Sequence, residues 1–214
     1  EVKAEIARVH IHGFDPRSST VHWRFAEPSG RQIVLEIIDG KCIFYENNLG
    51  VLTNSPSFDW QLTNLNNYVN LLPGRTEPHT IGNMSLTSFG GGSAMIGLPG
   101  DFTPPSRFVR AAFFQSTAPQ KPDAEGSVFT AFHILGSMEI PIGAQFPVDE
   151  TPADIPSATQ CTCVTDMSGL RFYYRSMYDG GIRCIDLKEI DFKKIGLKSE
   201  PLVPSKKEFV HHIR

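Results

Sequence analysis

The feature that most constrains the fold is a strand-like run that passes through a polar turn into an amphipathic helix, between residues 50 and 68. The apolar run Val51-Leu52 ends in Thr53-Asn54-Ser55-Pro56, whose residue types favour a turn. The apolar residues that follow recur at the spacing of one helix face, and they are Phe58, Leu62, Leu65, Val69 and Leu72. Such a face needs a sheet to pack against. A strand end that leads into a helix often displays polar groups in a cleft, so Asn54 is the candidate centre of a site.

Period-two alternation of apolar and polar residues predicts antiparallel strands before and after this helix. The strands expected before it, joined by the turns at 28–30 and 39–40, form a four-stranded meander over 21–27, 31–38, 41–46 and 51–53. Those expected after it, with turns at Ser168-Gly169 and Asp179-Gly180-Gly181, are 159–167, 170–178 and 182–187. Two antiparallel sets with helices between them predict an α+β protein of stacked sheets, in a single domain over residues 1–214.

Three further helices are expected, at residues 2–9, 104–114 and 124–138. Thr103 followed by Pro104 is typical of a helix start. The segment between Arg75 and Gly100 is too rich in glycine for regular structure, and loops of this length are usually functional or mobile.

Composition and charge exclude two partner classes. The chain has 214 residues, of which 40% are hydrophobic. Its formal charge is −3, and its positive and negative residues are interspersed, so no basic face is apparent. No apolar run approaches the roughly 18 residues that span a bilayer. We therefore expect neither a nucleic-acid partner nor a membrane partner.

The four cysteines are too irregularly spaced for a disulfide framework, so we expect reduced, buried thiols. Cys161 and Cys163 lie two apart on a predicted strand and face the same side, but their spacing is not the CxxC of zinc and redox sites. No metal and no cofactor are predicted.

Arg107 lies in the first turn of the helix predicted from Pro104. A cation there opposes the helix dipole at a cost of some tenths of a kcal/mol, so an anionic or carbonyl partner is expected. The residues alone leave two other interpretations open: Asn54 as a turn residue that bonds its own backbone, and Arg107 as a surface arginine lying over apolar neighbours.

Three segments, VLTNSPSFDWQL at 51–62, GLPGD at 97–101 and SRFVRA at 106–111, together with the hairpin around Trp23 and FYYR at 172–175, carry a family likeness. They resemble the choloylglycine hydrolase family, which includes conjugated bile salt hydrolases and penicillin V acylases. The likeness covers essentially the whole chain.

The resemblance implies a four-layer αββα sandwich of the N-terminal-nucleophile hydrolase class. In that class the free amine of an N-terminal cysteine acts as the base and its thiolate attacks an amide carbonyl. The resemblance assigns Asn54 as a donor to the oxyanion, and Arg107 as the arginine that lowers the pKa of the nucleophile. The implied substrate is a small linear, non-peptide amide, with its acyl group in a pocket built partly by residues 9–19, where Ile11 and Phe14 are the candidate contacts, and by the glycine-rich loop.

The resemblance further implies a bacterial enzyme, and we expect a homo-oligomer; the sequence leaves its location open between cytoplasm and periplasm. None of the four cysteines is N-terminal, and the family's nucleophile would precede Glu1. The 214 residues therefore resemble the C-terminal part of the sandwich, here incomplete, and alone they are expected to be inactive. Their expected partner is an N-terminal segment of the same protein that carries the nucleophilic cysteine. A closed sheet within these residues would contradict this expectation.

A rival class keeps the fold but lacks the nucleophile, and would make the protein a non-catalytic binding or assembly module. The first residue of the processed polypeptide distinguishes the two, because only the enzyme requires a cysteine there.

Overall fold

The computed structural model describes residues 1–12, 21–150 and 158–202. The chain divides into two compact units, Glu1–Thr117 and Ala118–Arg214. Helices and antiparallel sheets occur in both, so the α+β prediction is confirmed, while the single domain over 1–214 stays a prediction. Within the described residues no helix is long and apolar enough to cross a membrane.

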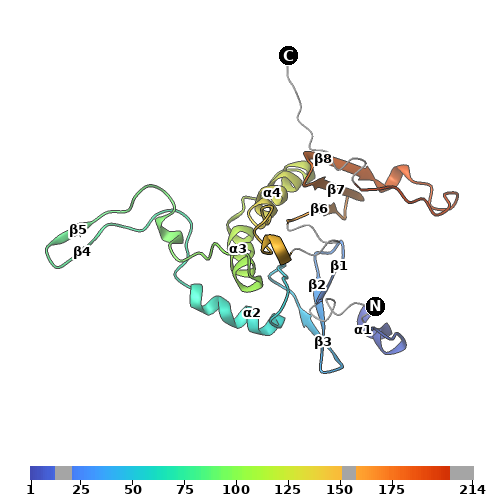
Figure 1. The fold of residues 1–214 in the computed structure, drawn as a ribbon, viewed down its shortest axis with the longest axis horizontal. Helices are drawn as coiled ribbons and strands as arrows, with labels where there is room; N and C mark the ends of the chain where they lie inside the picture. Colours follow the sequence, from blue (N-terminus) through green and yellow to red (C-terminus); the bar gives the residue numbers. More distant parts are fainter. Residues whose placement is uncertain (13–20, 151–157, 203–214) are drawn as a thin grey trace, which may run out of the picture. The chain divides into compact units, whose positions relative to one another are not determined.

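The first unit contains helices, 3-10 helices (η) and two antiparallel sheets (Figure 1). In chain order its elements are α1 (Val2–Glu5), η1 (Ile6–Arg8), β1 (Trp23–Ala26), β2 (Gln32–Ile38), β3 (Lys41–Glu46), α2 (Phe58–Asn64), η3 (Leu65–Tyr68), β4 (His79–Ile81), β5 (Met84–Leu86), η4 (Ser93–Met95) and α3 (Pro104–Thr117).

The first sheet has the order β1-β2-β3, with both pairs antiparallel. The β2–β3 turn is the two-residue loop Asp39-Gly40, and both residues have positive φ, at 49° and 73°. Asp-Gly favours such a turn because its twist matches that of the flanking strands. Three of the four predicted strands of the meander are thus confirmed.

The fourth predicted strand, at 51–53, is wrong, since this segment is irregular in the structure. The reason is the buried side chain of Asn47, whose Nδ2 donates to the Val51 carbonyl at 3.1 Å and whose Oδ1 accepts from the Gly50 N–H at 2.8 Å. An asparagine side chain here takes the place that a strand partner would have. Val51 is nevertheless buried, as its apolar character requires.

The helix after the turn is shorter than predicted. α2 gives way to η3 at Leu65, and the chain leaves helical structure after Tyr68, so Val69 and Leu72 are exposed. The buried face of α2 consists of Phe58 and Gln61, three residues apart. The predicted apolar face is therefore buried only at its first residue, Phe58. The helix predicted at 2–9 is also short, with α1 followed by η1.

The core of the first unit lies between this sheet and helices α2 and α3. Its buried members are Val34, Val51, Phe58, Phe108 and Ala112. The rings of Phe58 and Phe108 meet edge to face with centroids 6.1 Å apart, an arrangement that aromatic pairs favour. This packing positions the start of α3 beside the turn that precedes α2. Thr53 Oγ1, in that turn, donates to the carbonyl of Pro104, the first residue of α3, at 3.1 Å.

Residues 75–100 do contain regular structure, contrary to the prediction. β4 and β5 form a short antiparallel hairpin, and η4 follows the glycines. Figure 1 shows this hairpin at the tip of a long excursion of the chain between α2 and α3.

The second unit contains α4 (Ala124–Gly136), η5 (Val148–Glu150), β6 (Cys161–Asp166), β7 (Arg171–Ser176), β8 (Asp179–Asp186) and η6 (Leu187–Glu189). Helix α4 and the three antiparallel strands were predicted, and α4 packs on β6. The predicted turn at Asp179-Gly180-Gly181 is wrong, because the chain turns at Met177-Tyr178 and β8 begins at Asp179.

An ionic cluster ties α4 to this sheet. Arg175 on β7 donates from Nη2 to Glu139 Oε1 at 2.8 Å and lies over the ring of Phe132, and Thr162 on β6 donates to the same Glu139 oxygen. All four cysteines of the chain are free and exposed, so the prediction of buried thiols is wrong, although that of unpaired thiols is confirmed.

Neither three-stranded sheet is closed: β1 and β3 are edge strands of one, and β6 and β8 of the other, among the described residues. That the chain is an incomplete sandwich stays a prediction.

Candidate active site

The turn at Thr53–Pro56 places Asn54 on the surface beside the first turn of α3. Its Ser55-Pro56 peptide bond is cis. The backbone of the turn is held on both sides of the exposed amide, by the Thr53 bond to α3 and by Gln61 Nε2, which donates to the Asn54 carbonyl at 3.3 Å. The side chain of Asn54 therefore projects from an anchored backbone.

The structure brings the two predicted catalytic residues together. Arg107 donates from Nη2 to Asn54 Oδ1 at 2.8 Å. A guanidinium has no acceptor, so the amide must present its oxygen to it and turn its nitrogen the other way. No described group accepts a hydrogen bond from Asn54 Nδ2. The pair thus presents a fixed, unused N–H donor, which is what an oxyanion site needs.

Arg107 itself is half-buried and is fixed at a second point, because its Nε donates to the Phe102 carbonyl at 3.0 Å. This is a carbonyl partner of the kind that its position in the first helical turn predicted. Burial lowers the pKa of the Arg107 guanidinium, and the like charge of Arg110 lowers this pKa further. An arginine nevertheless keeps its charge near neutral pH.

Arg110, one turn further along α3, is buried and holds the preceding loop. Its Nη1 donates to the carbonyls of Pro99 and Asp101 at 2.7 and 2.6 Å, and its guanidinium lies 5.7 Å from the centre of the Phe102 ring. Since that loop also supplies the carbonyl that holds Arg107, Arg110 supports the site indirectly.

Asp101 is a turn residue before the start of α3. Ser106 donates to its Oδ2 at 2.6 Å, while the Thr103 hydroxyl and N–H donate to its Oδ1 at 2.5 and 2.9 Å. These donors hold the pKa of the Asp101 carboxyl well below its usual range, with Ser106 contributing most. A carboxylate so stabilised does not serve as a proton donor.

The two predicted substrate contacts are not placed at this site. Phe14 lies outside the described residues, and Ile11 is half-buried and lines neither of two cavities of about 450 Å³ in the first unit. One cavity lies beside β1 and the start of the chain. The contribution of Ile11 and Phe14 to an acyl pocket stays a prediction.

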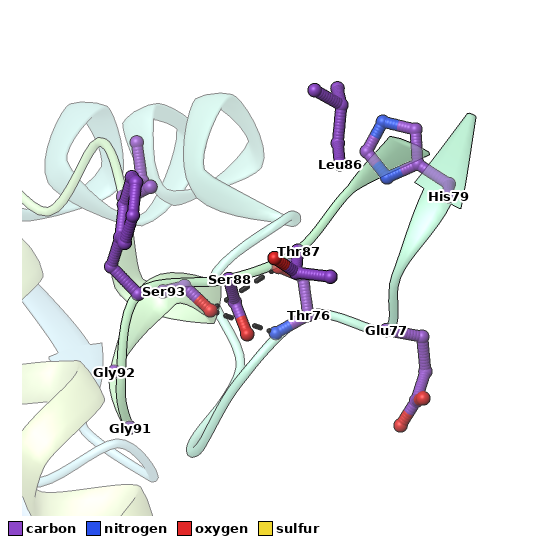
Figure 2. A pocket seen from close by; sticks show the side chains of 11 residues that line it. Thr76, Glu77, His79, Leu86, Thr87, Ser88, Gly91, Gly92 and Ser93 are labelled. Atoms are coloured by element: carbon purple, nitrogen blue, oxygen red, sulfur yellow. Dashed lines mark hydrogen bonds between the residues drawn. The ribbon is translucent and has the colours of Figure 1, made fainter. Parts of the chain in front are cut away.

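The other cavity lies at the base of the β4–β5 hairpin and includes Gly91 and Gly92, so the glycine-rich loop does line a hollow. Figure 2 shows Ser93 bonded to Thr76, with Glu77 pointing away from them. Neither Asn54 nor Arg107 lines it. Within the described ranges no group of three or more His, Cys, Asp or Glu side chains could hold a metal ion.

Sequence reasoning missed two buried polar residues behind the turn, Glu36 and Gln61. The signal for Glu36 was present, because it is the one charged residue within Ile33–Ile38 of a strand. Gln61 gave no such signal, because polar residues are ordinary on an amphipathic helix.

Known proteins resemble this chain over most of its length. The model of the linear amide C–N hydrolases, choloylglycine hydrolase family, matches residues 1–200. A bile salt hydrolase/transferase from Clostridium perfringens is 37% identical over 172 residues, which are 80% of this chain and 51% of that protein. A penicillin V acylase from Pectobacterium atrosepticum is 31% identical over 195 residues, 84% of this chain and 45% of its own.

A solved structure agrees with the sequence comparison. The crystal structure of a cysteine-to-alanine mutant of the conjugated bile acid hydrolase from Clostridium perfringens superposes with a TM-score of 0.78 at 33% identity, and covers 90% of this chain and 57% of that one. This likeness confirms the N-terminal-nucleophile hydrolase fold class. The chain spans about half the length of these relatives. With a family match over nearly its full length, the chain belongs to the choloylglycine hydrolase family of linear amide C–N hydrolases.

Proposed function

We propose that the intact protein hydrolyses a small linear, non-peptide amide, with Asn54 as an oxyanion donor and Arg107 as the residue that holds it. The single observation that carries this proposal is the 2.8 Å bond from Arg107 to Asn54 Oδ1, which fixes the direction of the Asn54 N–H donor and leaves it without an acceptor among the described residues. Membership of a family of amide hydrolases supplies the reaction class.

The nucleophile in this proposal is a cysteine at the start of the mature polypeptide, on a segment outside the 214 residues. Its thiolate attacks the amide carbon, and the C–N bond breaks as the amine leaves with a proton from the α-ammonium group. Water then hydrolyses the thioester. An α-amino group has a pKa near 8 in model peptides, so it can relay protons at neutral pH without a histidine.

Asn54 acts in both steps, because each passes through a tetrahedral intermediate with negative charge on the former carbonyl oxygen. A fixed donor that is paired with the oxyanion more strongly than with the ground-state carbonyl lowers the barrier, by about 3 kcal/mol for one such donor. The positive charge of Arg107 lies one side chain behind this donor, where it favours developing negative charge.

Conjugated bile salts are the first substrates to test, because the bile salt hydrolase/transferase is closer in sequence than the penicillin V acylase. Pocket width and polarity decide between such acyl groups. An acyl homoserine lactone is the third candidate amide.

The experiment is to purify the intact polypeptide, determine its first residue and mass, and measure release of amine from glycocholate, penicillin V and an acyl homoserine lactone. A mature N-terminal cysteine with turnover of one of the three is the expected result. A free N-terminal cysteine with no turnover of any of them contradicts the substrate class. A first residue other than cysteine contradicts the enzyme and favours a binding module.

A further inference from the structure

Glu36 is a carboxylate in a place where a strand normally buries an apolar side chain. It lies on β2 between Leu35 and Ile37, is 1% exposed, and belongs to the same face of the sheet as Val34 of the core. Burying a carboxylate is costly unless it is paired, and burial does raise the pKa of Glu36, although His22 and the Phe58 N–H oppose that rise. Such a residue needs a structural or functional reason.

The contacts of Glu36 point toward the candidate active site. Its Oε1 lies 3.0 Å from His22 Nδ1 and accepts the N–H of Phe58 at 2.8 Å. Phe58 is the first residue of α2, and the residue before it, Ser57, makes no side-chain capping bond. The carboxylate of β2 therefore takes the place of the missing cap and fixes the start of α2 on the sheet.

Gln61 continues this connection from α2 to the site. It lies one turn after Phe58, is 2% exposed, and donates from Nε2 to the carbonyl of Asn54 at 3.3 Å. Among the described residues, both Glu36 Oε2 and Gln61 Oε1 are buried without a hydrogen-bond partner. Unpaired buried oxygens cost stability, so neither side chain is explained by its contribution to folding alone.

We propose that Glu36 and Gln61 are positioning residues for Asn54. Glu36 fixes α2 at Phe58, and Gln61 fixes the Asn54 backbone to α2, so that the amide held by Arg107 keeps its direction. Arg107 sets which atom of the amide faces outward, whereas these two side chains set where the amide sits. The inference rests on the proposed function, since it explains how the donor is held.

The test uses three variants of the intact enzyme, with turnover expressed per titrated N-terminal cysteine. Glu36→Leu keeps the volume but removes the acceptor, and should lower kcat by about 10- to 100-fold while KM changes less than about twofold, because misplacing a catalytic group by about 1 Å has that effect. Glu36→Gln keeps an oxygen for Phe58 and should restore kcat to within about threefold of the wild type.

Glu139→Leu is the matched control. It removes a carboxylate with comparable donors, Arg175 and Thr162, from the second unit, so it should destabilise the protein but leave kcat per active site unchanged. Gln61→Leu should lower kcat about as much as Glu36→Leu does. The double variant should lose less kcat than the product of the two single losses, because both side chains act through the same turn. An unchanged kcat in Glu36→Leu, or a loss that Glu36→Gln does not restore, overturns the inference.

Amide hydrogen exchange separates this inference from the proposed function, because it needs no turnover. The peptide that covers residues 54–60 should exchange at least about tenfold faster in Glu36→Leu than in the wild type, and at the wild-type rate in Glu36→Gln. If the wild type hydrolyses no amide but exchange changes in this way, the proposed function fails while the anchoring of the turn stands. Unchanged exchange in Glu36→Leu refutes the anchoring, whatever the activity.

Discussion

At Asn54 a single contact decides what the side chain can do. Arg107 occupies the amide oxygen, and the nitrogen is left as a donor. We expect Asn54→Ala in the intact enzyme to lower kcat by about 10²- to 10³-fold with little change in KM, because an oxyanion donor acts mainly in the transition state. Steady-state kinetics check this, with the exposed Asn48→Ala as the control. A normal kcat would remove Asn54 from the site.

Arg107 offers a more discriminating change. Lysine in Arg107→Lys keeps the charge but cannot bond both the Phe102 carbonyl and Asn54 Oδ1 with one planar group. Loss of one bond from a charged donor costs about 1.5 kcal/mol, so kcat should fall roughly tenfold. If Arg107→Lys is fully active, charge alone matters at this position, and the fixed orientation of Asn54 does not.

At the scale of the element, α2 depends on how its first residue packs. Phe58 is fully buried between Tyr45 and Phe108, with ring centroids 5.5 and 6.1 Å away. Phe58→Ala should lower the free energy of unfolding by about 3–5 kcal/mol. Urea denaturation of the intact protein measures this, and Phe192→Ala, at a side chain that is 67% exposed, should be close to neutral. Equal effects in the two variants would contradict the core described.

The start of α3 should depend on pH through Asp101, whose pKa is lowered by its donors Ser106 and Thr103. A depressed pKa in the folded state means that the stabilisation is present above the unfolded-state pKa and is lost as the pH falls toward the folded-state value. The urea midpoint of the wild type should therefore fall more steeply below about pH 4 than that of Asp101→Asn. Glu77→Gln, at an exposed carboxylate, is the control; parallel curves for the wild type and Asp101→Asn would contradict the assignment.

The same elements show how far sequence reasoning reaches. Alternation and Asp-Gly predicted β1 to β3, and the family motif predicted that Asn54 and Arg107 belong together. The strand at 51–53 could not be excluded, because the competing partner is the side chain of Asn47 rather than a pattern in the segment itself. Gln61 was missed because helix periodicity detects apolar faces, whereas this buried face includes an amide.

At the scale of the whole molecule, the proposed assembly is a homo-oligomer of the intact protein. Large apolar side chains are exposed along the excursion that carries β4 and β5, including Val69, Phe89 and Ile96. Burying such side chains against a second copy of the protein would be favourable. Light scattering of the intact protein should give a mass that is a multiple of the polypeptide mass, and a monomer at micromolar concentration would contradict this expectation.

The bond between Arg107 and Asn54 also has a consequence for the ageing of the protein. Asn54 is exposed and is followed by the small residue Ser55. Hydrolysis of its side-chain amide to aspartate, with release of ammonia, would leave an oxygen for Arg107, so the contact and the fold would survive. The donor, however, would become a carboxylate at the position where negative charge must develop. Stored enzyme should then lose activity without losing structure, in proportion to the fraction of residue 54 that peptide mass spectrometry finds converted to aspartate.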